Sequence, residues 1–376
     1  MFIKELDCEV FKNINCKNLP SLRRNIVYQF LYELLIVFIP LFTIPYVSRV
    51  LGAENIGLFS YTYAVANYFV LFANLGIKNM VRNNKEELNR NFSEILSIHI
   101  IFSIIVIFVY LVLLFFFVED NLVIFLIQSI YVFAAVFDIN WFFFGIEKFK
   151  LTVGRNTLVK ILSVFLVLVF VKTQTDLWIY ALILALSVFV GQSVVWFALK
   201  QYVSWRRPSW ANMKQHIRPL FVLFLPILAL SLYKYMDKIM LGSISSNVQV
   251  GFYENAEKII NVPMSLIMAF GVVLMPRIAN MVTSKDKGEV FKLIDMSMEA
   301  VMLLAIAISF GLAGISFVLA PIFFGYEFEE CGILIMGLAV TVPFMAFANV
   351  IRTQYLIPYK EDKIFVVSID KSFIII

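Results

Sequence analysis

Long stretches without Asp, Glu, Lys or Arg recur along this chain of 376 residues. A helix that spans a bilayer needs about 20 mostly apolar residues, because the hydrocarbon core is about 30 Å thick and a helix rises about 1.5 Å per residue. Together with shorter apolar runs, these stretches predict ten membrane-spanning helices. Their approximate ranges are 26–50, 57–77, 93–117, 122–145, 153–172, 177–199, 219–243, 250–275, 297–322 and 331–357.

The composition supports a membrane protein. Hydrophobic residues make up 61% of the chain and charged residues 15%, against roughly 45–50% and 25% in soluble domains. A soluble enzyme is excluded, since a folded surface in water needs more polar cover. The apolar runs are continuous rather than alternating, which argues against a membrane β-barrel. We expect an all-α integral membrane protein, built as a polytopic helical bundle.

The charged loops predict the orientation of the chain. Cytoplasmic loops of membrane proteins carry an excess of Lys and Arg. The N-terminal leader, residues 1–25, is basic, and so are the loops after every second predicted helix, whereas the other loops are nearly bare of positive charge. We therefore expect a multi-pass membrane protein with a cytoplasmic N-terminus. The net charge of +5 follows from this topology, so no nucleic-acid partner is needed to explain it.

A pattern near residue 40 recurs about 190 residues later. Phe38-Ile-Pro-Leu-Phe, Val50-Leu-Gly and Gly57-Leu-Phe are matched in order by Phe224-Leu-Pro-Ile-Leu, Met240-Leu-Gly and Gly251-Phe-Tyr. Copies that are six helices apart share their orientation, as in two-lobed transporters. The pattern predicts two six-helix lobes, 26–200 and 219–376, joined by an interfacial cytoplasmic linker at 201–218.

The second lobe is expected to be incomplete. It holds four predicted helices, and the apolar stretch 364–376 that follows them is too short to span a bilayer. About ten complete membrane helices and an unfinished eleventh are therefore predicted, as in a truncated chain.

Three stretches carry a resemblance to a known family. They are PLFTIPYVSRVLGAENIGLFSYTYAVANYFVLFANLGI at 40–77, DINWFFFGIEKFK at 138–150 and YMDKIMLG at 235–242. From about residue 22 to about residue 370, the chain resembles the polysaccharide-biosynthesis flippases of O-antigen, capsule and teichoic-type pathways. That family belongs to the multidrug/oligosaccharidyl-lipid/polysaccharide exporter superfamily. The leader is longer than is usual in the family, and the last helices are missing.

The resemblance implies a transporter rather than an enzyme, with a central cavity between two six-helix lobes. Such proteins move undecaprenyl-pyrophosphate-linked oligosaccharide repeat units from the cytoplasmic to the outer leaflet. The implied partners are this lipid-linked substrate, membrane lipids, and the polysaccharide polymerase and glycosyltransferases of the same pathway.

Charged residues within the predicted spans are candidate functional residues, because each costs about 2.5–3.5 kcal/mol at the centre of a span. Lys234, Asp237 and Lys238 are the densest group, and side chains three or four residues apart share a helix face. One reading is a positive cluster on a cavity wall that attracts a pyrophosphate or an acidic sugar. The other is an internal Lys–Asp pair that neutralises itself.

Four further charged residues are weaker candidates for a functional role. Arg49 either snorkels to the outer headgroups or lines the cavity, and the resemblance favours the cavity because an arginine recurs at this motif position. Lys160 is a cavity candidate as well. Asp138 is expected to have a structural role and to pair with Lys160 or Arg155, and Arg352 is expected to snorkel.

Other chemistry lacks its sequence signals. There is no G-x-x-x-x-G-K-[ST] loop for ATP. The two histidines and three cysteines have no metal-ligand spacing, so no cofactor, metal or catalytic residue is predicted. An ion gradient or the supply of substrate would drive transport. Two alternatives remain: a cation-coupled multidrug exporter of the same superfamily, and a membrane-embedded polysaccharide polymerase, which the short outer loops disfavour.

Overall fold

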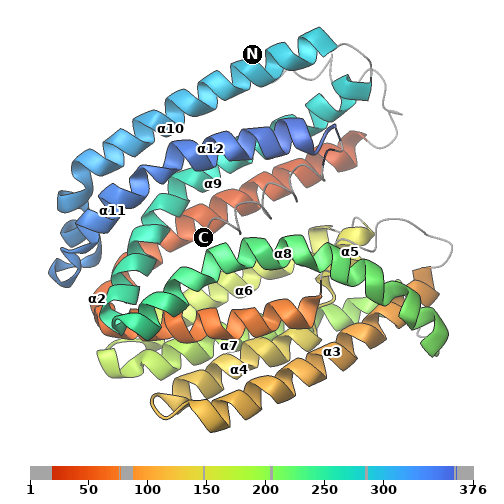
Figure 1. Ribbon diagram of the computed structural model, residues 1–376, viewed down its shortest axis with the longest axis horizontal. Coiled ribbons are helices and arrows are strands. Elements are labelled where there is room, and N and C mark those ends of the chain that lie inside the picture. Colours follow the sequence, from red (N-terminus) through yellow and green to blue (C-terminus); the bar gives the residue numbers. More distant parts are fainter. Residues whose placement is uncertain are drawn as a thin grey trace. The chain divides into compact units, whose positions relative to one another are not determined.

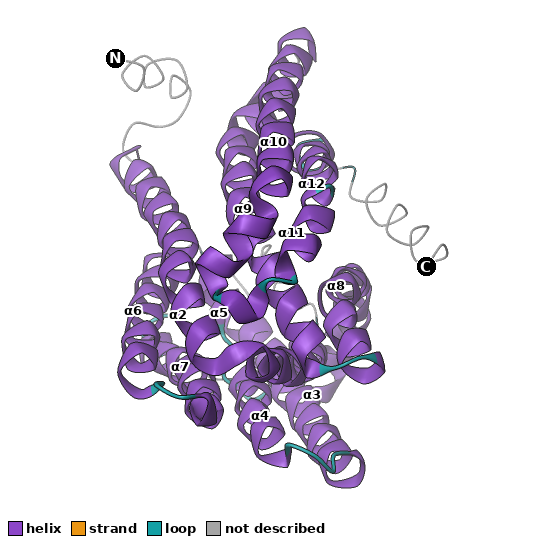
Figure 2. Cartoon of the chain, turned by 90° about the vertical axis from the view of Figure 1, so that its left-hand side faces the viewer, coloured by secondary structure: helices purple, strands orange, loops and turns teal. Residues whose placement is uncertain are grey.

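The computed structural model describes residues 19–75, 77, 88–146, 149–203, 206–283, 287–359 and 361. Within these residues the chain is helical with turns and short loops, and no strand occurs. Figure 2 shows the helices in purple. The leader up to residue 18 and the C-terminal apolar stretch 364–376 lie outside the described residues.

Each of the ten segments predicted from the apolar runs is helical over most of its described residues, which confirms the all-α fold (Figure 1). The long helices are α2 (Leu19–Asn74), α3 (Leu88–Phe117), α4 (Leu122–Val136), α6 (Phe149–Phe170), α7 (Leu177–Leu199), α8 (Trp210–Ile244), α9 (Asn247–Thr283) and α10 (Lys287–Phe324). Shorter elements are α5 (Asn140–Gly145), the 3₁₀ turns η3 (Gln174–Asp176) and η4 (Tyr326–Phe328), α11 (Cys331–Ala339), α12 (Thr341–Val350) and the π-helical turn η5 (Ile351–Leu356).

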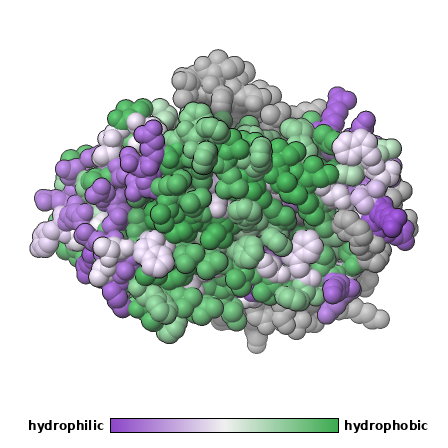
Figure 3. Space-filling model, turned by 90° about the horizontal axis from the view of Figure 1, so that it is seen from below, coloured by the Kyte–Doolittle hydropathy of each residue, from purple (hydrophilic) through white to green (hydrophobic). Residues whose placement is uncertain are grey.

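Six stretches of the described chain are long and apolar enough to cross a membrane: Ile39–Asn74, Asn91–Phe117, Leu122–Phe143, Gln174–Leu199, Gly288–Phe324 and Cys331–Leu356. Many large hydrophobic side chains on these helices are exposed on the protein surface, among them Phe108, Phe197 and Phe310. The hydropathy-coloured surface in Figure 3 shows such apolar residues over a broad area. The chain is therefore a polytopic membrane protein.

The fold divides into two compact units. In its described part, the first unit holds residues 19–40, 256–322 and 329–361, and the second holds 41–255 and 323–328. Two lobes at 26–200 and 219–376 remain a prediction.

The second unit is a helical bundle around an aromatic core. In it α4 packs against α3 and α7, α7 packs against α6, and α3 contacts α8. Trp141, Phe142 and Phe143 of α5 are fully buried. Two buried polar side chains of this core have backbone partners, which offsets the cost of taking them out of water. Tyr110 Oη donates to the Phe125 carbonyl at 3.0 Å, and His99 Nε2 lies 2.7 Å from the Ala135 carbonyl.

The first unit has an aliphatic core between α9, α10, α11 and α12. Ile260, Val301 and Ala346 are among its buried residues. Ser309 Oγ donates to the Ala339 carbonyl at 2.7 Å, and Gln354 Nε2 donates to Ser297 Oγ at 2.8 Å. Such hydrogen bonds between polar side chains and neighbouring helices are common among membrane helices.

The predicted linker is anchored to α3. Its second half forms the first turns of α8, where Asn212 Nδ2 and His216 Nε2 each lie 2.9 Å from a carboxylate oxygen of Glu94. Glu94 is 1% exposed. The amide of Arg206 donates to Ser93 Oγ at 3.0 Å. The chain between the sixth and seventh predicted helices is thus held by polar bonds to the start of α3.

Gly52 interrupts α2 between the first and second predicted helices. Its φ of 77° and ψ of 170° lie in a region that glycine enters readily and other residues do not. The first helix, predicted at 26–50, therefore ends within two residues of the predicted position. In the second copy, α8 ends at Ile244, two residues beyond Gly242.

The two copies of the repeat touch each other at their second glycines, Gly57 and Gly251, within the second unit. A Cβ on Gly57 would lie 1.6 Å from the carbonyl oxygen of Asn247, and one on Gly251 would lie 2.1 Å from that of Ala53. Beside this contact, Asn255 Nδ2 donates to Ser48 Oγ at 2.9 Å, and both residues are buried. Backbone therefore meets backbone where α2 crosses α9.

We expect Gly57→Ala to destabilise the protein, because the added methyl group has to push two backbones apart. Overpacking of this kind costs about 1–3 kcal/mol, which thermal unfolding in detergent will show as a lower midpoint. Gly154→Ala is the matched control, since no atom lies within 4 Å of its Cβ position and alanine favours a helix. Equal midpoints for the two variants would contradict the close contact.

Candidate functional site

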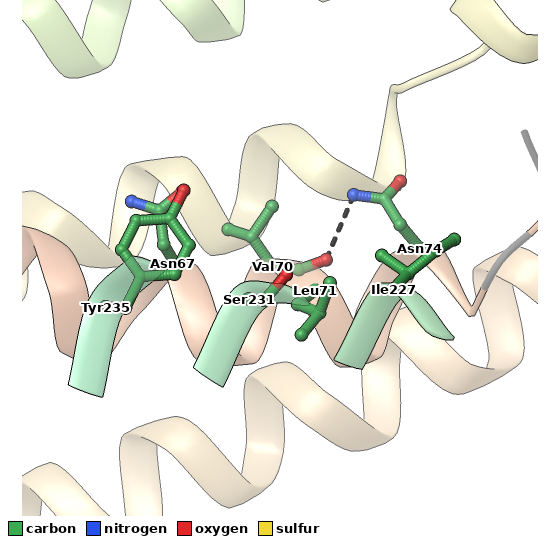
Figure 4. Close-up of a pocket in the computed structure, with 7 residues that line it drawn as sticks. All are labelled: Asn67, Val70, Leu71, Asn74, Ile227, Ser231 and Tyr235. Carbon is green, nitrogen blue, oxygen red and sulfur yellow. Dashed lines mark hydrogen bonds between the residues drawn. The ribbon is translucent and has the colours of Figure 1, made fainter. Parts of the chain in front are cut away.

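A pocket lies between α2 and α8 in the second unit (Figure 4). Its volume is about 200 Å³. The wall on α2 combines two asparagines with two aliphatic residues, and the wall on α8 adds a serine, a tyrosine and an isoleucine. The lining residues are Asn67, Val70, Leu71, Asn74, Ile227, Ser231 and Tyr235. None of them is charged at neutral pH.

The two asparagines of this pocket are held by their own helix. Asn67 Nδ2 donates to the Tyr63 carbonyl at 2.8 Å, and Asn74 Nδ2 donates to the Val70 carbonyl at 3.0 Å. Both bonds run back one turn along α2. This positions each carboxamide at a fixed place on the pocket wall.

An aromatic pair and a cation border the pocket. The rings of Tyr68 and Tyr235 meet edge to face, with 6.0 Å between their centroids. Tyr68 Oη also donates to the Leu232 carbonyl at 3.4 Å. Lys234 is exposed, and its Nζ lies 5.4 Å from the centre of the Tyr235 ring. The positive charge therefore stands beside the pocket rather than among its lining residues.

The other two members of the predicted charged cluster have partners on α9. Asp237 Oδ2 accepts a hydrogen bond of 2.7 Å from Tyr253 Oη. Lys238 Nζ lies 2.5 Å from Glu254 Oε2, and both side chains are mostly buried, with 11% and 14% exposed. Of the predicted cluster, Asp237 and Lys238 therefore join α8 to α9, while Lys234 keeps an exposed charge.

Sequence reasoning missed Glu254 and Tyr253. The sequence could have pointed to them, because Glu254 is an acidic residue within the predicted span 250–275 and directly follows the Gly251-Phe-Tyr motif of the second repeat copy.

Arg49 lies on α2, close to the turn between α10 and η4. Its side chain is exposed and comes close to Gly325. Nearby, the Glu327 carboxylate accepts a hydrogen bond of 2.8 Å from the Ala53 amide, just after the break at Gly52. A carboxylate at a helix N-terminus satisfies an amide that has no partner within the helix. Glu327 therefore stabilises the start of the second half of α2.

Asp138 is buried before α5. Its Oδ1 accepts bonds from the backbone amide of Asn140 at 3.0 Å and from the Asn140 side chain at 2.7 Å. Arg155 donates to the Asn140 side-chain oxygen at 3.1 Å. The carboxylate and the arginine thus share Asn140 as a partner, and the structural role expected of Asp138 stays a prediction.

Lys160 and Arg352 belong to other elements than the cluster on α8. Lys160 is half-buried on α6, where its carbonyl accepts a bond from Ser163 Oγ at 2.8 Å. Arg352 belongs to the π-helical turn η5 of the first unit and is exposed. Among the described residues, no three His, Cys, Asp or Glu side chains gather as metal ligands would. The structure brings together Lys234, Asp237 and Lys238, beside the pocket on α8.

We expect Lys238→Met to lower stability by about 3 kcal/mol, because it removes the ammonium that pairs with a mostly buried carboxylate. The double variant K238M/E254M replaces both charges with apolar groups of similar length and should recover most of that loss. Thermal unfolding in detergent measures both effects. A double variant as unstable as the single one would contradict a structural pair.

Comparison with known proteins places the chain in a family. The model of the family described as "Polysaccharide biosynthesis protein" matches residues 22–282. A relative from Escherichia coli (strain K12) named "Putative O-antigen transporter" is 26% identical over 363 residues, covering 93% of this chain and 86% of the relative. A relative of the same name from Shigella dysenteriae is 23% identical over 364 residues, covering 91% and 88%.

A solved structure has the same fold. It is the lipid II flippase MurJ in an inward closed conformation, with a TM-score of 0.65 and 15% sequence identity. The match covers 88% of this chain and 74% of MurJ. Together with the apolar helices, these findings describe a multi-pass bacterial membrane protein. The chain belongs to the polysaccharide biosynthesis protein family, whose model matches more than half of its residues.

Proposed function

We propose that this protein is a flippase for lipid-linked oligosaccharides. Its substrate would be an undecaprenyl-pyrophosphate-linked repeat unit of an O-antigen, a capsule or a similar polysaccharide. The family match, the names of the two relatives and the MurJ-like fold support this proposal. The polymerase and the glycosyltransferases of the same pathway would be its partners, and the N-terminus would lie in the cytoplasm.

The observation that carries the proposal is the meeting of the two repeat copies at Gly57 and Gly251. Transporters with internal repeats work by moving one repeat against the other around a fixed site. Here the contact between the copies, the pocket and the charged cluster all lie on α2, α8 and α9. We propose that this contact separates when the substrate-binding cavity opens to the outer leaflet and forms again when it closes.

The charged residues receive roles in this proposal. Lys234 and Arg49 are exposed and would attract the pyrophosphate, since Lys and Arg bind phosphate oxygens strongly. Asp237 and Lys238 would hold α8 against α9 and shape the same cavity wall. Lys160 is proposed as a further cavity residue. The lobes 26–200 and 219–376 would be the two moving bodies.

Deletion of the gene should abolish the surface glycan of the host and cause undecaprenyl-pyrophosphate-linked intermediates to accumulate. The wild-type gene on a plasmid should restore the glycan. Unchanged surface glycan after deletion would overturn the proposed function.

Within the same complementation test, Asp237→Ala should reduce surface glycan several-fold, because Tyr253 loses its acceptor on α8. Glu329→Ala is the control, since this residue is exposed outside the cluster. Immunoblots of membranes must show equal protein levels. A normal amount of surface glycan in the strain with Asp237→Ala would show that transport does not need this carboxylate.

A disulfide between α2 and α9 should trap the proposed closed contact. In a background in which Ser replaces Cys8, Cys16 and Cys331, Ser48→Cys and Asn255→Cys place two thiols where the native side chains are hydrogen-bonded. Oxidation should stop transport, and a reductant should restore it. The two single-cysteine variants should be insensitive to oxidant. Full transport by the cross-linked protein would show that this contact does not open.

A further inference from the structure

The pocket between α2 and α8 differs from a phosphate site in its chemistry. Phosphate groups are bound by Arg, Lys or the free amides of a helix N-terminus. Among the described residues, those that line this pocket include no charged side chain, and all of them lie within helices. The nearest cation on its own helix wall, Lys234, lies over the Tyr235 ring. The pocket is therefore suited to an uncharged ligand.

The polar groups of the pocket match a ligand with several hydroxyl groups. A carboxamide offers two donors and a carbonyl acceptor, and in Asn67 and Asn74 one N–H is used by the preceding turn of α2. The Asn67 side chain also bonds to the side chain of Tyr63. The amide oxygens of both residues and the second N–H of Asn74 can therefore take part in binding. Ser231 adds a hydroxyl that donates and accepts. In Figure 4, the Asn74 carbonyl oxygen lies on the side of the amide away from the bond to Val70.

The spacing of these groups fits a ring rather than an extended chain. Asn67 and Asn74 are seven residues apart on one face of α2, which separates them by about 10 Å along the helix axis. Val70 and Leu71 lie between them on α2, and in Figure 4 Ser231 of α8 lies beside Leu71 while Ile227 lies beside Asn74. The α2 wall thus has a carboxamide at each end and an apolar middle, and the hydroxyl group of Ser231 lies across from that middle. A pyranose has hydroxyl groups around its rim and apolar C–H faces.

The volume limits the size of the ligand. Pockets for drug-sized ligands measure roughly 300–1,000 Å³, and this one measures about 200 Å³. It has room for one ring of an oligosaccharide and not for a whole repeat unit. We propose that this pocket binds a single uncharged sugar residue of the transported headgroup, while the pyrophosphate remains outside it, beside Lys234. This inference rests on the proposed flippase function for the identity of the ligand.

Saturation-transfer NMR on the purified full-length protein in nanodiscs tests the proposal directly. The probes are the methyl glycosides of glucose, galactose and N-acetylglucosamine at millimolar concentration, with inorganic pyrophosphate as a competitor. At least one glycoside should receive saturation from the wild-type protein. In N67L/N74L this signal should fall at least five-fold, and pyrophosphate should not displace the sugar. Absence of signal from all three glycosides, or displacement by pyrophosphate, would overturn the proposal.

Matched variants separate binding from folding. Ser231→Ala changes the opposite wall by one hydroxyl group and should weaken the signal even if N67L/N74L does not fold. Ser163→Ala on α6 removes a hydroxyl group whose bond is to its own helix, and it should leave the signal unchanged. An undiminished signal in both N67L/N74L and Ser231→Ala would place the sugar elsewhere.

The outcome is independent of the transport test. If a sugar binds here and deletion of the gene leaves the surface glycan intact, the pocket stands and the proposed substrate of transport is wrong. If deletion abolishes the glycan and no sugar binds, the flippase proposal stands and the pocket inference is wrong.

Discussion

The close approach of α2 and α9 is the constraint on which the arrangement of the candidate site depends. At Gly57 and Gly251 the two backbones lie so near each other that neither position has room for a Cβ. Membrane helices associate through such close packing, because lipid provides no hydrophobic force between them. The contact holds α9 beside the second half of α2, and α8, which leads into α9, forms the other wall of the pocket.

The charges around this contact follow from the cost of ionised groups in an apolar environment. Lys238 pairs with Glu254, Asp237 accepts from Tyr253, and the carboxylate of Glu327 accepts from the backbone at the break in α2. The first two bonds join the consecutive helices α8 and α9, and the third joins η4 to α2, far away in the sequence. Apolar contacts are not directional, so they do not fix where one helix lies along its neighbour. The polar bonds of the second unit fix these positions.

Local features of the sequence were enough to predict the helices. The length and apolarity of each segment, the glycine at the break in α2 and the order of the repeat motifs can all be read from neighbouring residues. The partners of the charged residues were not predictable in the same way. Asp138 was expected to pair with Lys160 or Arg155, which stays a prediction, and the structure adds Asn140, which donates to its carboxylate and accepts from Arg155. Helical spacing placed Lys234 near Asp237, and it could not reveal Tyr253 or Glu254 on the next helix.

The sequence by itself determined that this is an all-α membrane protein with a repeated motif and a few charges within its spans, because apolar length and charge are properties of single segments. Only the tertiary structure decided which of those charges meet, which glycines touch, and that an uncharged pocket lies next to a lysine. These features depend on how each helix is rotated about its axis and where it crosses its neighbours. Rotation and crossing are set by packing between residues far apart in the chain, as at Gly57 and Gly251, which no local pattern encodes.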